Sequence, residues 1–112
     1  MQTMAQLDNV YRKMAECYHS VYGMDLKEIF LYGSYARGDF NKESDIDIAA
    51  IVKGNRTELQ EKLKKVWDVS ADVGLEHDVV VSPIVIPLDE FEEYKDKLPY
   101  YMNILKEGKR IG

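Results

Sequence analysis

Two aspartates, a glycine and a serine stand out in the sequence because of their types and their spacing. Gly33 and Ser34 follow an apolar run, and after ten further residues Asp45 and Asp47 open a second apolar run. Residues i and i+2 of a strand point to the same face, so the two carboxylates are expected side by side. Like charges held together repel each other, and a bound cation relieves that repulsion. The pair therefore predicts a metal site.

The Gly-Ser pair adds a place for phosphate groups. Gly33 has no side chain to obstruct a ligand, and Ser34 offers a hydroxyl and an N–H where a strand should end and a helix begin. Helix starts bind phosphate through free N–H groups and the helix dipole. Arg37 follows in a polar loop, where it is either a helper for phosphate binding or a solvated arginine. Phosphate-binding groups beside paired carboxylates predict a metal-dependent nucleotide site.

Asp78 is the candidate for a third carboxylate. It heads the apolar run DVVVSPIVI, which predicts a strand over residues 78–86. Pro83 cannot donate a hydrogen bond to a sheet, so this strand is expected at the sheet edge or at a bulge. If it lies beside the Asp45–Asp47 strand, Asp78 can join the two other acids. Glu76 is a weaker candidate, and a solvent-facing strand start is the alternative for Asp78.

The elements that must position these residues alternate between helices and strands. A helix is expected over residues 2–22, with Met4 on its apolar stripe. A second helix should run from a Thr57 cap to about Val73, with Trp67 pointing inward. Asp89 and Glu92 should form a capping pair for a helix near the C-terminus. The other predicted elements are the strands Leu26–Tyr32 and Ile46–Val52, a short helix from Ser34, and a last helix from Pro99. This order predicts an α/β fold, with a small mixed β-sheet flanked by helices, in one domain over residues 1–112.

Composition narrows the class of protein. The net charge is −5, which disfavours nucleic acid as a partner, because nucleic-acid binding requires a basic face. A nucleoside triphosphate can still bind, since it brings magnesium that bridges it to acidic groups. The sequence contains no run of eighteen apolar residues and no signal-peptide pattern. It therefore predicts neither a membrane span nor secretion. The single cysteine, Cys17, fits a reducing compartment, so we expect a cytoplasmic protein.

The stretch GSYARGDFNKESDID resembles the signature of the nucleotidyltransferase superfamily to which DNA polymerase beta belongs. In a chain this short it looks most like the minimal nucleotidyltransferases, the antitoxin partners of HEPN-domain toxins in toxin–antitoxin pairs. The signature covers only Gly33 to Asp47, but the order of the expected elements agrees along the whole chain. The resemblance implies the minimal nucleotidyltransferase fold and a third carboxylate on the next strand, here Asp78.

The same resemblance implies a reaction. Two Mg²⁺ ions, or Mn²⁺, would be held by Asp45, Asp47 and Asp78, and the triphosphate of ATP by Gly33, Ser34 and Arg37. AMP would pass to a hydroxyl group, most simply a tyrosine of a cognate HEPN ribonuclease toxin, and this AMPylation would neutralise the toxin. Two alternatives remain open: an antitoxin that masks the toxin by binding without catalysis, and a small-molecule nucleotidyltransferase of the aminoglycoside type.

Overall fold

A four-stranded mixed sheet forms the centre of the computed structural model, which describes residues 3–112. The strand order is β3-β2-β1-β4; β1 pairs antiparallel with β2 and with β4, and β2 pairs parallel with β3. In chain order the elements are α1 (Met4–Tyr22), a 3-10 turn (Gly23–Asp25), β1 (Leu26–Tyr32), α2 (Ser34–Arg37), β2 (Ile46–Val52), α3 (Arg56–His77), β3 (Val81–Pro87), α4 (Leu88–Tyr94), α5 (Pro99–Glu107) and β4 (Lys109–Arg110). The predicted α/β class with a small mixed sheet flanked by helices is confirmed.

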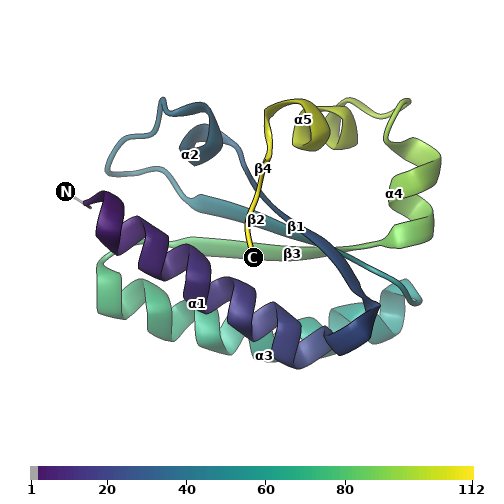
Figure 1. Cartoon of the computed structure of the whole chain (residues 1–112), viewed down its shortest axis with the longest axis horizontal. Coiled ribbons are helices and arrows are strands. Elements are labelled where there is room, and N and C mark those ends of the chain that lie inside the picture. Colours follow the sequence, from purple (N-terminus) through teal and green to yellow (C-terminus); the bar gives the residue numbers. More distant parts are fainter. Residues whose placement is uncertain (1–2) are drawn as a thin grey trace.

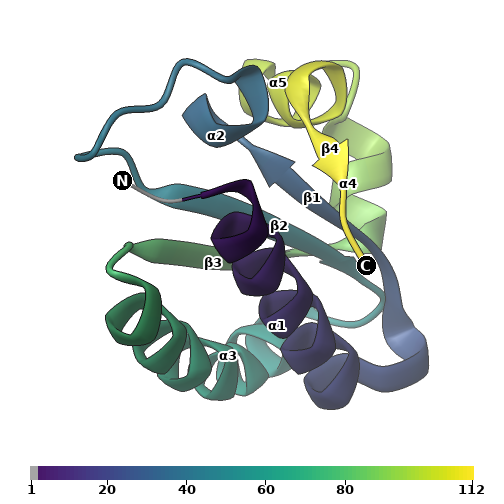
Figure 2. The same cartoon turned by 60° about the vertical axis from the view of Figure 1, so that its left-hand side comes forward.

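Helices cover both faces of the sheet. In Figure 1 the long helices α1 and α3 lie below the sheet, while α2, α4 and α5 lie above it. In Figure 2 α1 crosses in front of α3, and the Tyr22 hydroxyl on α1 donates to the Leu59 carbonyl on α3 at 2.8 Å. The helices therefore form two layers, with the sheet between them.

Strand β2 is buried on both faces, and of its seven residues only Asp47 is half-buried. One set of its side chains packs under α1 and α3 in the larger core cluster, which includes Ile46, Ile48, Ala50 and Val52. Ala49 and Ile51 face the other way and join a smaller cluster with Phe91 of α4 and Ile104 of α5. Because β2 has apolar neighbours on both sides, its register is strongly determined.

Helix α1 begins with a capping box, in which the Gln6 N–H donates to the Thr3 hydroxyl and the Thr3 N–H to the Gln6 side chain. The helix runs to Tyr22, as predicted; residue 2, which the prediction included, lies outside the described residues. The inward position predicted for Met4 is wrong, because this side chain at the first turn is 74% exposed.

The predicted boundary between α3 and β3 is wrong. The helix begins at Arg56 with Asn55 as its cap, in place of Thr57, and it continues to His77. Asp78 is therefore the C-cap of α3, in the left-handed region at φ 55°, and the strand starts three residues later, at Val81. Trp67 points outward and is 49% exposed, contrary to the prediction. The edge position predicted for the strand from Pro83 is confirmed.

Gly74 explains why the helix end was misplaced. It sits inside α3, and its carbonyl accepts a hydrogen bond from the Val79 N–H at 3.0 Å. A Cβ atom on residue 74 would lie 2.6 Å from the Val79 carbonyl oxygen. The glycine does not end the helix; it makes room for the chain that folds back against the helix to enter β3.

The C-terminal helices α4 and α5 pack on the sheet face opposite to the one that α1 and α3 cover (Figure 1). The Asp89–Glu92 capping pair is not formed, because Pro87 holds the N-cap position of α4 without a side-chain cap. The tail forms the short strand β4 on the edge of β1, where Arg110 lies 5.9 Å from the Phe30 ring centroid and its guanidinium pairs with Glu28 at 3.0 Å. Within residues 3–112, no helix has the length and apolar character needed to cross a membrane.

The tight α3–β3 turn gives a stability prediction. Helix propensity alone favours Gly74→Ala by about 1 kcal/mol. We expect the variant to be destabilised nonetheless, because the overpacking penalty against the Val79 carbonyl is about 1–3 kcal/mol. Urea denaturation measures the difference, with Ala71→Gly on the exposed side of α3 as the control; the control should lose about 1 kcal/mol through propensity. A gain in stability for Gly74→Ala would contradict the close packing of this turn.

Candidate active site

The paired carboxylates lie at the start of β2, on the sheet face that α4 and α5 cover. Asp45 immediately precedes the strand and is exposed, while Asp47 is the second strand residue and is half-buried. The Ile46 N–H between them donates to the Val80 carbonyl at 2.8 Å, which anchors this end of β2 to the segment before β3. The rigid central strand therefore holds the pair, with one carboxylate in solvent and one partly withdrawn from it.

Gly33 and Asp47 are in direct contact. Gly33 has φ 73°, a backbone region that favours glycine, and it links the end of β1 to α2. A Cβ atom on residue 33 would lie 2.5 Å from Oδ2 of Asp47. The sequence suggested that this glycine lets a ligand approach the backbone; in the structure it is the Asp47 carboxylate that fills this space. Any larger residue at position 33 would displace the carboxylate.

Burial and the charges of two neighbouring residues shift the pKa of Asp47. Burial raises the pKa of its carboxyl above the ordinary value, and the neighbouring charge of Asp45 raises it further, while Arg37 lowers it. The charge of Asp45 also contributes, after burial, to the raised pKa of the Tyr35 hydroxyl. The ionised forms of the two side chains therefore repel each other, and Asp47 also loses hydration through burial. Both effects fit the expected affinity for a divalent cation.

Ser34 begins α2, which is only one turn long. The Gly33 carbonyl accepts from the Ala36 and Arg37 N–H groups, both at 3.1 Å, and these bonds close the turn. A single turn carries little of the macrodipole that the sequence suggested for phosphate binding. Phosphate binding at this position would depend on the Ser34 hydroxyl and on nearby backbone N–H groups.

A loop from Gly38 to Asp45 closes one side of the site. Tyr35 and Phe40 stack with their centroids 4.1 Å apart and their planes 7° apart, so the loop is fastened to α2. At its outer end the Ser44 hydroxyl accepts from the Asn41 N–H at 3.0 Å. The loop therefore returns the chain from α2 to the carboxylates in a defined path.

Arg37 is paired with acids of its own chain. Its guanidinium contacts Asp39 at 3.2 Å and Glu107, on α5, at 3.1 Å. These pairs raise its pKa further, through the hydrogen bond to Asp39 first and that to Glu107 next. The bridge to Glu107 joins α2 to α5, which lie close together in Figures 1 and 2.

The structure gives Asp78 and Ser82 positions that the sequence did not suggest. Ser82 is the β3 residue in register with Asp47, and its hydroxyl donates to Oδ2 of Asp45 at 3.5 Å. Asp78 lies four residues earlier in the chain, at the exposed C-cap of α3. In the part of the chain that the structure describes, no three acidic, histidine or cysteine side chains form a group that could hold a metal ion. The Asp78 assignment stays a prediction.

Sequence reasoning missed the row of polar groups that crosses the sheet at Asp47. The row consists of Tyr32, Asp47 and Ser82 on three adjacent strands, all half-buried. Strand register decides which residues lie opposite each other, and no spacing along the chain encodes it. The only signal in the sequence was Tyr32 itself, a polar hydroxyl at the end of an otherwise apolar strand.

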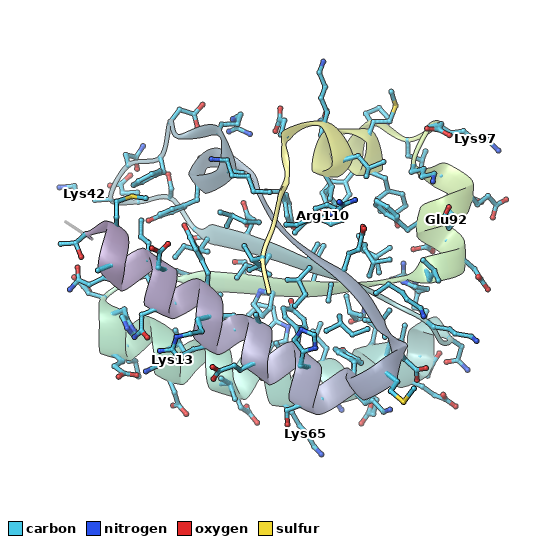
Figure 3. The ribbon with its side chains drawn as sticks, in the orientation of Figure 1. Lys13, Lys42, Lys65, Glu92, Lys97 and Arg110 are labelled. Carbon is cyan, nitrogen blue, oxygen red and sulfur yellow. The ribbon has the colours of Figure 1, made fainter. Side chains whose placement is uncertain are left out.

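Several lysine and arginine side chains are spread over different elements of the fold (Figure 3). The labelled cations Lys13, Lys42, Lys65, Lys97 and Arg110 lie at separate places around the molecule in Figure 3. Lys13 pairs with Glu76 at 3.0 Å and Lys95 with Glu92 at 2.9 Å, so part of this charge is neutralised locally. The expectation, from net charge, that nucleic acid is disfavoured as a partner stays a prediction.

Removal of one charge from the pair tests the electrostatic description. A carboxyl whose pKa is raised by folding destabilises the folded protein above that pKa, because its ionised form is disfavoured there. We therefore expect metal-free Asp47→Asn to melt at a higher temperature than the parent at pH 7. The difference should shrink as the pH falls through the raised pKa of Asp47, and it should vanish well below 3.8, the ordinary value for this group, where the parent carboxyl is protonated in both the folded and the unfolded state. Equal melting temperatures at pH 7, with EDTA present, would contradict it.

Comparison with known proteins identifies the family of the chain. A family model for the nucleotidyltransferase domain matches residues 12–111. The chain is 31% identical over 102 residues to Putative protein adenylyltransferase MJ0604 of Methanocaldococcus jannaschii, covering 91% of this chain and 94% of that protein. It is 38% identical over 76 residues to Putative protein adenylyltransferase MJ0141 of the same organism, covering 62% and 75%.

Solved structures share the fold at low identity. A protein described as a putative minimal nucleotidyltransferase has a TM-score of 0.61 at 16% identity, over 96% of this chain and 95% of that one. A toxin–antitoxin complex with AMP-PNP has a TM-score of 0.55 at 18% identity, over 89% of this chain and 70% of that one. A tri-AMPylated HEPN toxin of Shewanella oneidensis in complex with its MNT antitoxin gives 0.51 at 18%, over 96% and 71%. The sheet and its flanking helices thus have the fold of minimal nucleotidyltransferase structures, and the chain belongs to the nucleotidyltransferase domain family.

Proposed function

We propose that this nucleotidyltransferase transfers AMP from ATP to a tyrosine hydroxyl of a HEPN-type toxin and so acts as its antitoxin. The observation that carries the proposal is the Asp45–Asp47 pair beside Gly33 and Ser34, in a chain whose relatives are named as protein adenylyltransferases. The nature of the partner is supported by the toxin–antitoxin complexes that share this fold. The chain is small, so the acceptor is expected to bring part of its own binding surface.

Asp45 and Asp47 are the residues that would hold Mg²⁺ or Mn²⁺. Magnesium in such sites is typically bound by one or two carboxylates together with substrate phosphates. The pair fits that description, because Asp45 is exposed and Asp47 has a raised pKa that a cation would relieve. When bound, the metal neutralises charge on the triphosphate and lowers the barrier to attack on it.

The other site residues would orient the nucleotide. Ser34 would donate to a phosphate oxygen, and Gly33, which has no side chain, lets the Asp47 carboxylate lie against the Gly-Ser turn. Arg37 forms ion pairs with Asp39 and Glu107. It would contribute to phosphate binding only after one of these ion pairs is broken. In the transfer, the acceptor oxygen attacks the α-phosphorus and pyrophosphate leaves with the electrons of the broken P–O bond.

A second metal ion depends on a group beyond the pair. We retain Asp78 as the proposed third ligand on the strength of the family resemblance. Ser82 holds the register position beside Asp47, and a neutral hydroxyl is a weak ligand by comparison. Activity of Asp78→Asn beside that of Asp45→Asn decides the matter: equal losses support the third carboxylate, and an unaffected Asp78→Asn refutes it.

Nucleotide binding gives the first prediction for this function. Calorimetry with ATP should show tight binding in magnesium and little binding in EDTA, because two carboxylates otherwise repel the triphosphate. Ser34→Ala should lose about 1.5–3 kcal/mol of binding free energy, the usual contribution of a hydrogen bond to a charged group. Ser20→Ala, exposed on α1, is the matched control and should bind like the parent. Equal affinity in EDTA and magnesium would refute the metal-dependent site.

Transfer to the partner gives the second prediction. The double variant Asp45→Asn/Asp47→Asn should fold and bind the cognate toxin, yet transfer AMP about a thousandfold more slowly or worse, since charge stabilisation at such sites contributes that much. The readouts are the intact mass of the co-expressed toxin and the growth of the cells. Asp68→Asn/Asp72→Asn removes two exposed acids of α3 and should behave as the parent.

The same experiment separates catalysis from masking. Among residues 3–112, no third acidic, histidine or cysteine side chain completes a metal-binding group with the pair, so non-catalytic masking is the main competing function. Under masking, parent and double variant would rescue growth equally and neither would change the mass of the toxin. Loss of rescue together with loss of the mass increase supports the enzymatic function.

A further inference from the structure

A pair of tyrosine hydroxyls lies beside the paired carboxylates. Tyr32 and Tyr100 have their hydroxyl oxygens 2.9 Å apart, and their rings meet edge to face with centroids separated by 6.1 Å. Tyr32 is the last residue of β1 and is directly opposite Asp47 in the antiparallel pair. Residues opposite each other in such a pair have Cα atoms about 4.5–5.5 Å apart and side chains on the same face. The Tyr100 hydroxyl is thus connected, through one side chain, to the position of Asp47.

The two tyrosines differ in their freedom to move. Tyr32 is half-buried, and its pKa is raised by burial first, then by the hydrogen bond and charge of Tyr100, and then by the charge of Asp47. It therefore stays protonated and fixed. Tyr100 is 51% exposed on α5, so its ring can rotate without opening a cavity in the core.

The backbone that carries Tyr100 is well anchored. Ile104 is buried beneath α5, and the neighbouring Tyr101 hydroxyl donates to Glu90 at 2.7 Å. Glu107 at the end of α5 holds Arg37 of α2. Helix α5 is therefore fixed against α2, which follows the Gly-Ser turn of the candidate nucleotide site. Tyr100 lies in the first turn of α5 and is exposed.

We propose that Tyr100 is a nucleotide acceptor within this chain: in the absence of a partner, the site transfers the nucleoside monophosphate of a bound nucleoside triphosphate to the Tyr100 hydroxyl. This inference rests on the proposed function, which already assigns a tyrosine hydroxyl as the acceptor. The phenol of Tyr100 has the same chemistry and is held at the edge of the site. Effective concentrations within one molecule favour such a reaction over one between molecules.

The step balances without a further reactant. The Tyr100 Oη attacks the α-phosphorus and forms a P–O bond, while the bond from that phosphorus to the bridging oxygen of the β-phosphate breaks. Pyrophosphate leaves with the electron pair, and the phenolic proton passes to solvent. Tyr32 positions the Tyr100 hydroxyl before the step through the hydrogen bond between them.

Incubation of the purified chain alone with ATP and magnesium tests the inference. Intact mass spectrometry should show the gain of one adenylyl group in the parent, and fragmentation should locate it on Tyr100. Tyr100→Phe should show no gain, with an unchanged melting temperature and unchanged ATP affinity by calorimetry. Tyr101→Phe removes the adjacent hydroxyl, which is bound to Glu90, and is the matched control; it should be modified like the parent.

The outcomes separate this inference from the function on which it rests. ATP binding and transfer to the toxin, without any modification of the parent alone, would overturn the inference and leave the proposed function in place. An adenylyl group on another residue, or undiminished modification of Tyr100→Phe, would also overturn it. A rate constant that falls on dilution of the protein would show transfer between copies and refute the step within one chain. Failure to bind ATP in magnesium would refute both.

Discussion

The burial of β2 on both faces is the constraint on which the rest of the molecule depends. Alternate side chains of this strand pack into two separate cores, so a shift of one residue would expose one core and bury the wrong groups in the other. The strand therefore cannot slide, and Asp47, which continues the row of Ala49 and Ile51, is held on the α5 side of the sheet. Chemistry that needs carboxylates in a fixed position is thus supported by hydrophobic packing that has no chemical role.

The candidate site combines backbone and charge arrangements that are unfavourable by themselves, within a fold whose other elements follow their local sequence preferences. Gly33 adopts a backbone conformation that favours glycine, and the space it leaves is filled by an acid whose pKa is raised by burial and by Asp45. Such departures from favourable local structure are expected at functional sites, where the surrounding fold stabilises what the site alone would not. Here the two long helices and the Tyr35–Phe40 stack provide that support.

The C-terminal third of the chain surrounds the site in addition to completing the second core. Helix α5 packs through Ile104, and the short strand β4 adds to β1, where Arg110 covers the Phe30 ring. The Arg37–Glu107 pair then joins this region to α2. Because α5 is fixed in this way, the hydroxyl of Tyr100 lies 2.9 Å from that of Tyr32, the residue opposite Asp47 in the sheet. The segment for which the sequence predicted only a last helix from Pro99 therefore also contributes to the surroundings of the site.

The sequence by itself determined the α/β class, the two central strands and the Gly-Ser and aspartate pairs, because apolar periodicity and motif spacing are properties of neighbours along the chain. It misplaced the end of α3, since Gly74 has a role only when Val79 folds back upon it. The same error made Asp78 head a strand, whereas Ser82 is the residue beside Asp47. Only the tertiary structure decided which residues meet across the strands, because register and helix packing are set by contacts between segments distant in sequence.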